Sequence, residues 1–269
     1  MTTSSLDVTR ATVFEHALLD EPLLGLDALA DAARLPRSKV EHHLGTLPAL
    51  LPGGEADRLD ATPGEIVSGI ADNGSWVMLS SLATLPEYAP LLGPAAARFE
   101  LALRARGEQI VAHNLVAFVG APGACVPVHF DRNHHALLQV AGTKTVGTGV
   151  FVDSREQQRQ LELGFQDDRM NADAMPDDAQ ERELGPGDAL TIPAFMFHWV
   201  RGGDDVSVAL TCTAATESSI RATAVHRFNL RARRFGLHPG PPGRRPGVDR
   251  TKERVMARRD ARAARHAAA

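Results

Sequence analysis

Cysteine is scarce in this chain: its 269 residues include only two, Cys125 and Cys212. Two thiols are too few for a zinc site built on cysteine, so that class of site is excluded. Both residues fall in segments with the pattern of strands, and we expect buried free thiols rather than a disulfide. Little cysteine and no disulfide is typical of the reducing cytoplasm.

Long apolar runs are lacking too. No stretch of the sequence approaches the roughly 20 apolar residues that a membrane-spanning helix needs. Residues 1–5 have neither the basic nor the apolar block of a secretory signal peptide. We therefore expect a cytoplasmic protein with no membrane partner. Hydrophobic residues still make up 43% of the chain, enough for the core of one large domain, alone or with a helical annex.

Charge is unevenly distributed along the chain, although the net charge is only −4. From His226 onward there are 13 Lys and Arg against 3 Asp and Glu, which gives this tail a net charge of +10. The residues before it hold the remaining 16 basic and 30 acidic side chains, a net charge of −14. A basic tail on an acidic body predicts docking on that body, on a second subunit, or on nucleic acid or a ribosome.

The first part of the chain, residues 1–108, is predicted to be mainly helical and to lead into a barrel. Apolar residues at helical spacing, with boundary signals from Pro, Gly and capping residues, predict helices over residues 26–33, 36–44, 62–74 and 93–106. The first two would be arranged as in a helix-turn-helix, although the second carries few basic residues for DNA phosphates. Residues 76–79 have the pattern of a strand.

From residue 109 to residue 216 the pattern changes to short strands separated by tight turns. Strands are predicted over residues 110–119, 126–131, 135–140, 144–151, 189–192, 197–200 and 206–213. Such a series is typical of a sandwich or barrel, and a double-sheet jelly roll would protect its edges and enclose a cavity. A polar insertion at about residues 153–183 has no clear periodicity and predicts a long loop, either a functional lid or a disordered insertion.

The basic C-terminal part, residues 217–269, predicts two helices over residues 217–235 and 249–266. Together with the helical first part, these helices would flank the predicted jelly roll on both sides in sequence. The chain is therefore predicted to be mainly β with helical flanks.

Three residues of the β-rich part have the pattern of a metal site. His129 and Asp131 stand at positions i and i+2 of a predicted strand and therefore point to the same side. His198, from a distant strand, would complete a face of two histidines and one carboxylate. Such a face leaves coordination positions open and suits non-haem Fe(II) oxygen chemistry.

Lys144 follows the turn residue Gly142 and is predicted to point into the same cavity as this face. A buried lysine needs a balancing anion, and we expect the distal carboxylate of 2-oxoglutarate. The keto-acid end of that molecule could chelate the metal and leave one position for O₂. The alternative is an ordinary surface lysine at the start of a strand.

Around these residues the sequence resembles the JmjC/cupin-like 2-oxoglutarate-dependent oxygenases. The resemblance rests on His129-Phe130-Asp131, the run from Leu137 to Lys144 and the segment from Leu184 to His198. It is greatest to the branch that contains the asparaginyl hydroxylases and covers roughly residues 109–213, while the two ends resemble bacterial members more loosely. It implies a double-stranded β-helix that holds Fe(II) through His129, Asp131 and His198 and binds 2-oxoglutarate through Lys144.

Two positions depart from the pattern of that family. Val126 stands where the family commonly has Thr, and His135 stands where it commonly has Asn. We expect Thr211 or Thr213, on the last strand, to supply the missing hydroxyl. His135 would replace the amide as a hydrogen-bond donor to 2-oxoglutarate.

The resemblance also implies a reaction and partners. The implied reaction is oxidative decarboxylation of 2-oxoglutarate to succinate and CO₂, coupled to hydroxylation of a substrate. A protein or peptide is favoured over a small molecule because the branch contains protein hydroxylases. C-terminal helices often pair subunits in this family, which implies a homodimer.

Two interpretations from other classes stay open at this point. One is a metal-binding cupin without oxygenase activity, such as an isomerase or a small-ligand binder, although such proteins usually have more histidines in the first strand motif. The other is a nucleic-acid-associated regulator that uses the basic tail or the helix-turn-helix pattern within residues 26–44.

Overall fold

Two antiparallel sheets form the centre of the computed structural model, which describes residues 6–51, 57–167 and 170–267. In the larger sheet the strand order is β1-β9-β6-β11-β4-β3-β2, and in the smaller sheet it is β5-β10-β7-β8. The strands of the larger sheet are β1 (Thr12–Glu15), β2 (Lys39–Leu44), β3 (Ser75–Ser80), β4 (Ile110–Gly120), β6 (His134–Ala141), β9 (Asp188–Ile192) and β11 (Ser207–Thr216). Those of the smaller sheet are β5 (Cys125–Phe130), β7 (Lys144–Gly149), β8 (Gln180–Leu184) and β10 (Phe197–Gly202).

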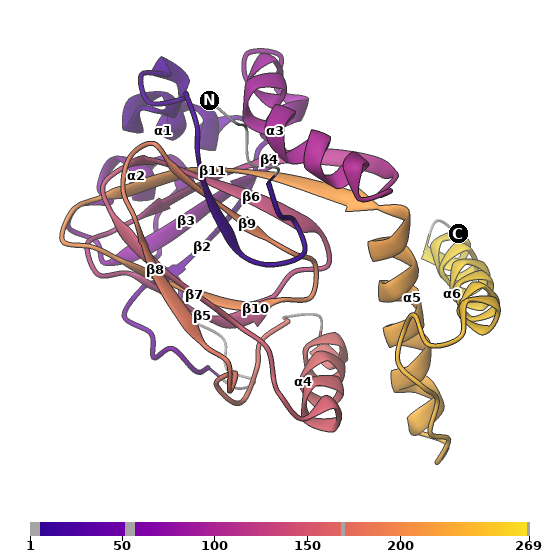
Figure 1. The fold of residues 1–269 in the computed structure, drawn as a ribbon. Helices are drawn as coiled ribbons and strands as arrows, with labels where there is room; N and C mark the ends of the chain where they lie inside the picture. The colour runs from indigo at the N-terminus through magenta and orange to yellow at the C-terminus, as the bar shows by residue number, and fades with distance from the viewer. Residues whose placement is uncertain (1–5, 52–56, 168–169, 268–269) are drawn as a thin grey trace.

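From β4 to β11 each strand lies in the other sheet from the one before it, except that β7 and β8 pair within the smaller sheet; this is the connectivity of a double-stranded β-helix, or jelly roll (Figure 1). β1 extends the larger sheet beyond β9, and the antiparallel strands β3 and β2 extend it beyond β4. The predicted fold class, mainly β with helical flanks, is therefore confirmed.

The first part of the chain is less helical than predicted. Helices α1 (Leu26–Arg34), α2 (Pro63–Ser68) and α3 (Leu92–Ala105) are present, but Thr12–Glu15 and Lys39–Leu44 are strands. Both strands pair at an edge of the larger sheet, where backbone hydrogen bonds to β9 and β3 outweigh the weak helical spacing of their apolar residues. The helix-turn-helix interpretation is therefore wrong, since its second helix does not exist.

The outer face of the larger sheet packs against helices and forms the main hydrophobic core. Alternate residues of β11, among them Leu210 and Cys212, point into this core together with Leu29 of α1 and Phe99 of α3. The other residues of β11 point to the space between the sheets. Cys212 and Cys125 are both buried free thiols, as predicted.

The insertion at residues 153–183 has regular structure, contrary to the prediction of a long loop. It contains helix α4 (Ser154–Asp167) and most of β8. Leu161 and Phe165 of α4 join the aromatic core on the outer face of the smaller sheet, where Phe165 lies 5.5 Å from Phe130 between ring centroids. The aromatic sheet surface gives a mostly polar helix a place to bury its few apolar side chains.

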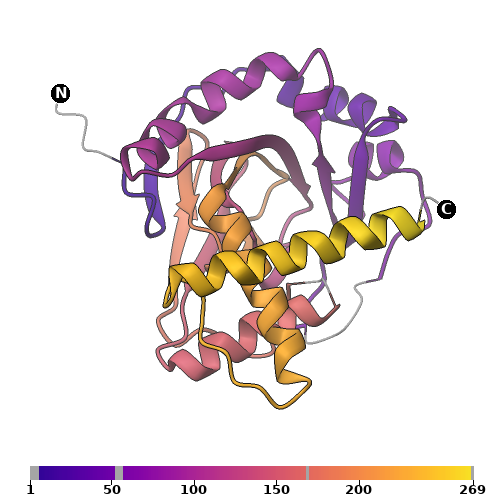
Figure 2. The ribbon, with the colours of Figure 1, turned by 90° about the vertical axis from the view of Figure 1, so that its right-hand side faces the viewer.

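The basic tail forms the two predicted helices, α5 (Glu217–Arg233) and α6 (Pro246–Ala267). α5 follows β11 directly and begins with a capping box between Thr216 and Ser219. α6 lies against the outer side of α5 (Figure 2). Among the described helices none is both long and apolar enough to cross a membrane. Residues 1–5, on which the signal-peptide prediction rests, lie outside the described residues.

Gly147 of β7 provides a test of this packing, because the indole ring of its cross-strand neighbour Trp199 occupies the space where a Cβ would lie. We expect Gly147→Ala to lower the free energy of unfolding by about 1–3 kcal/mol through overpacking. The matched control is Gly93→Ala in α3, where the space is open and Ala favours the helix by up to about 1 kcal/mol. Urea denaturation measures both changes, and equal midpoints for Gly147→Ala and wild type would contradict the packing described.

Candidate metal and cosubstrate site

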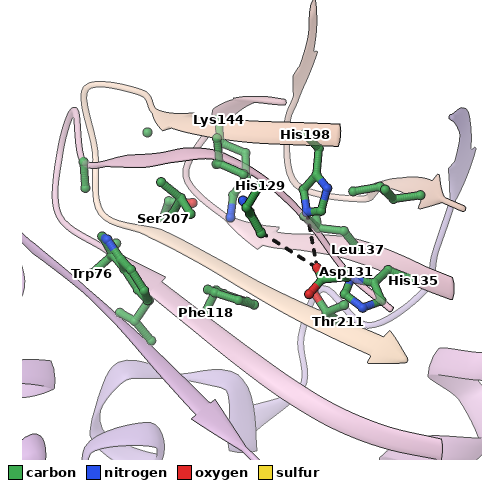
Figure 3. Close-up of a pocket in the computed structure, with 17 residues that line it drawn as sticks. Trp76, Phe118, His129, Asp131, His135, Leu137, Lys144, His198, Ser207 and Thr211 are labelled. Atoms are coloured by element: carbon green, nitrogen blue, oxygen red, sulfur yellow. Dashed lines mark ion pairs between the residues drawn. The ribbon is translucent and has the colours of Figure 1, made fainter. Parts of the chain in front are cut away.

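A cavity lies between the inner faces of the two sheets. At one end it is lined by His129, Asp131 and His198, and at the other end by Trp76 (Figure 3). Lys144 also lines it. The sequence placed four of these five residues in one cavity, and the structure brings them together there.

The three potential metal ligands meet because two strands of the smaller sheet hold them in register. His129 on β5 pairs directly opposite His198 on β10, and Asp131 follows the end of β5 on the same side as His129. Oδ2 of Asp131 lies 3.8 Å from Nε2 of His129 and 3.4 Å from Nε2 of His198. One ligand atom from each residue lies within 4.8 Å of the others, close enough to hold one metal ion.

The backbone orients both imidazoles for metal binding. Nδ1 of His129 lies 2.8 Å from the carbonyl oxygen of Pro127, and Nδ1 of His198 lies 3.0 Å from that of Met196. A carbonyl only accepts hydrogen bonds, so Nδ1 carries the proton and the lone pair is on Nε2. Two such lone pairs and a carboxylate oxygen converge on one point, an arrangement that a cation stabilises.

The protonation states of these groups fit a metal as well. Burial, and after it the neighbouring His198, lower the pKa of His129 to about 4, so its imidazole is neutral at pH 7. Burial alone would raise the pKa of Asp131, but the imidazoles of His135, His198 and His129 outweigh it and hold that pKa below its usual range. The site therefore presents the neutral imidazole of His129 and the carboxylate of Asp131.

The turn before His198 positions this strand. Phe195 has a φ of 65°, in the left-handed region that a bulky side chain rarely adopts. Its N–H donates a 2.7 Å hydrogen bond to the carbonyl oxygen of Asp131, which ties the turn to the end of β5. This strained residue thus lies in the turn next to the potential metal ligands. Strained backbone is often found in functional sites.

Lys144 is only 5% exposed. Among the described residues no carboxylate pairs with its Nζ, and burial lowers the pKa of this lysine to about 8. The preceding turn is fixed by Gln139, whose Nε2 donates to the carbonyls of Ala141 and Gly142 at 2.7 and 3.0 Å. Gly142 has a φ of 63° and lies against the carbonyl of Val206, so the turn has room for glycine alone.

Two further polar atoms in the cavity lack a partner. The indole Nε1 of Trp76 and the Oγ1 of Thr211 are buried, and neither forms a hydrogen bond within the described part of the chain. Both residues line the cavity. A buried donor without a partner costs about 1–3 kcal/mol, so these atoms fit a bound polar ligand. Trp76, Thr211 and Lys144 thus line one cavity with a potential hydrogen-bond donor on each side chain.

The other predicted site residues have different surroundings. His135 lines the cavity, and its Nδ1 lies 3.3 Å from Oδ2 of Asp131. Thr213 is buried and pairs with His135 in register, but it is not among the lining residues, since the lining on β11 does not extend past Thr211. Sequence reasoning missed Trp76, because its strand reaches the cavity only by pairing with β4.

A groove of about 420 Å³ lies at the end of the barrel where the potential metal ligands are found. It is bounded by the barrel residues Glu108, His134 and Phe195 and by the start of α5, including Ser218 and Arg221. His134 is the first residue of β6, next to His135 of the cavity. Successive strand residues point to opposite faces, so the groove lies outside the barrel at the end of β6 that holds His135, and among the described residues it shares no lining residue with the cavity.

No family model and no curated protein sequence matches this chain. Among solved structures, E. coli YcfD matches at a TM-score of 0.53 and 15% identity, over 93% of this chain and 64% of that one. A second YcfD structure, described as a ribosomal oxygenase in complex with cobalt and 2-oxoglutarate, matches at a TM-score of 0.51 and 15% identity. That match covers 92% of this chain and 62% of the YcfD chain. This chain thus spans less than two thirds of the length of YcfD. It shares with YcfD the double-stranded β-helix fold, as the resemblance to JmjC/cupin-like oxygenases predicted.

Proposed function

We propose that the protein is an Fe(II)- and 2-oxoglutarate-dependent dioxygenase that hydroxylates a side chain of a protein or peptide. The observation that carries this proposal is the convergence of His129, Asp131 and His198 at one end of a cavity that also holds the buried Lys144, which has no carboxylate partner among the described residues. The similarity in fold to YcfD, solved with cobalt and 2-oxoglutarate, supports it.

In this proposal His129, Asp131 and His198 hold the iron on one face and leave its other positions open. Bound iron would supply the oxygen chemistry that couples decarboxylation of 2-oxoglutarate, to succinate and CO₂, with hydroxylation of the substrate. His135 keeps the carboxylate of Asp131 in place through its Nδ1.

The distal carboxylate of 2-oxoglutarate would bind to Lys144. Its ammonium group would supply a positive charge to this carboxylate. The carboxylate would in turn offset the free-energy cost of burying that charge. Trp76 and Thr211 would donate hydrogen bonds to the same ligand, because their Nε1 and Oγ1 atoms are buried and have no partner in the described part of the chain. Thr211 would thereby supply the hydroxyl that Val126 cannot.

A protein or peptide substrate is supported by the groove beside the metal site, which is open to the outside and lined by both charged and apolar side chains. The similar YcfD is a ribosomal oxygenase, which makes a ribosomal protein a reasonable first substrate to test. A homodimer through the C-terminal helices and a cytoplasmic location stay predictions. Exposed Phe235 and Leu237, after α5, are apolar side chains that a dimer could bury.

The first test is anaerobic absorption spectroscopy of the protein with Fe(II) and 2-oxoglutarate. We expect a weak visible charge-transfer band that needs both additions, because a keto acid chelates iron at open positions. His198→Ala should abolish the band by removing a ligand. Lys144→Met should raise the concentration of 2-oxoglutarate needed for the band at least tenfold, whereas exposed Lys39→Met should not. Bound iron without any band would favour a cupin that is not an oxygenase.

The affinity for 2-oxoglutarate should depend on pH through Lys144. Only the ammonium form attracts a carboxylate, and burial lowers the pKa of this lysine to about 8. Affinity should therefore be nearly constant below about pH 7, fall roughly twofold by pH 8 and fall roughly fivefold more between pH 8 and pH 9. Calorimetry on the Zn(II) form measures it, and His129, with a pKa of about 4, does not titrate in this range. The same pH profile in Lys144→Met would refute the role of Lys144.

Trp76 can be followed by its own fluorescence, since the chain has only two tryptophans. In Trp199→Phe, Trp76 is the only indole, and its emission should change when 2-oxoglutarate is added to the Zn(II) form. In Trp76→Phe, which retains a ring without a donor, the Kd for 2-oxoglutarate should rise about tenfold while zinc affinity stays the same. An unchanged emission together with an unchanged Kd would place Trp76 outside the ligand site.

A further inference from the structure

Helix α6 carries a row of arginines on one side. Arg250, Arg254, Arg258 and Arg262 stand at four-residue intervals, and Arg265 follows; all five are exposed. Four residues advance a helix by about 6 Å and return to nearly the same side, so these five side chains form one row about 22 Å long. We refer to them as the arginine row.

The opposite side of α6 packs against the rest of the protein. Asp249, Lys252 and Met256 are buried there. The two remaining acidic residues of α6 also pair toward α5: Glu253 lies 3.0 Å from Nε of Arg221, and Asp260 lies 2.7 Å from Nη1 of Arg227. α6 is thus held by its acidic side chains, and its row of arginines is turned outward.

Asp249 also has a partner within the protein, because its carboxylate accepts a 2.8 Å hydrogen bond from the N–H of Gly243. No ion pair within the described part of the chain involves any member of the arginine row. Like charges four residues apart destabilise a helix by a few tenths of a kcal/mol per pair. The row is therefore unfavourable for the isolated protein, and an anion bound from outside would relieve its repulsion.

Figure 2 shows α6 in front of α5, accessible along its length. Arginine binds phosphate through two parallel N–H groups, which suits a ligand that offers a series of phosphates. A two-fold contact between copies of this chain through this side of α6 would place one row of arginines against the other, and like charges repel. The exposed Arg244 and Arg245, just before α6, continue the positive surface.

We propose that the arginine row binds the phosphate backbone of nucleic acid. A single row of phosphate contacts reads no sequence, so it would hold the protein on RNA or DNA without selecting a base. This surface is separate from the cavity, and its binding needs neither metal nor 2-oxoglutarate. The proposal therefore stands or falls independently of the proposed oxygenase activity.

The test uses the full chain and fluorescence anisotropy with labelled single-stranded RNA and DNA of about 20 nucleotides, longer than the sites typical of single-strand binding domains. The row variant is Arg250→Gln, Arg254→Gln, Arg258→Gln and Arg262→Gln together, since Gln keeps helix propensity. The matched control makes the same change at four exposed arginines outside the tail: Arg37, Arg58, Arg106 and Arg155. Circular dichroism checks that both variants are folded.

We expect the wild type to bind at about 50 mM salt, with an affinity that falls steeply by about 200 mM. The row variant should lose more than tenfold in affinity, and the slope of log K against log salt should decrease by about 3, whereas the control should stay within about threefold of wild type. Comparison of the RNA and DNA arms shows which backbone binds more tightly.

Three outcomes would overturn the proposal. The first is no binding of either probe by the wild type at about 50 mM salt. The second is an equal loss in the row and control variants, which would mean that only the total charge matters. The third is light scattering that shows a salt-sensitive dimer, lost in the row variant, in a protein that binds no probe. In that case the row binds the acidic body of a second copy.

Discussion

The antiparallel register between β5 and β10 is the constraint on which the candidate site depends. It sets His129 opposite His198, and the end of β5 brings Asp131 to the same point. A shift of one residue would turn each of these side chains to the opposite face of the sheet. On that opposite face Phe130 and Phe197 pack with α4, so the aromatic core that stabilises the smaller sheet also fixes the register of the potential metal ligands.

The cavity is lined by buried polar groups that do not stabilise the unliganded protein. Lys144 is buried without a carboxylate, and Trp76 and Thr211 hold hydrogen-bonding atoms without partners among the described residues. Each of these groups costs stability when it is desolvated. They line the same cavity as His129, Asp131 and His198, which fits the proposed binding of a small anionic ligand beside a metal.

The helices outside the jelly roll have separate roles. Those of the first part cover the outer face of the larger sheet and complete the main core. α4 covers the smaller sheet and is joined to α5 by an ion pair between Glu162 and Arg233. α5 in turn borders the groove at the barrel end and carries α6, whose acidic residues face inward and whose arginine row faces outward. The excess of basic residues in the tail thus forms a positive surface on the outward side of α6.

The sequence by itself determined the jelly roll and most of the candidate site, because both depend on local patterns: alternation along strands, Gly/Pro turns, and the i, i+2 spacing of His129 and Asp131. Where the local signal was weak, prediction was wrong. Lys39–Leu44 became a strand by pairing at a sheet edge, and the polar insertion became α4 because an aromatic sheet surface was available to it. Trp76 reached the cavity, and Thr213 stayed outside its lining, only through the pairing of distant strands. Spacing fixes which side of a strand a residue faces, but only tertiary contacts decide what lies on that side.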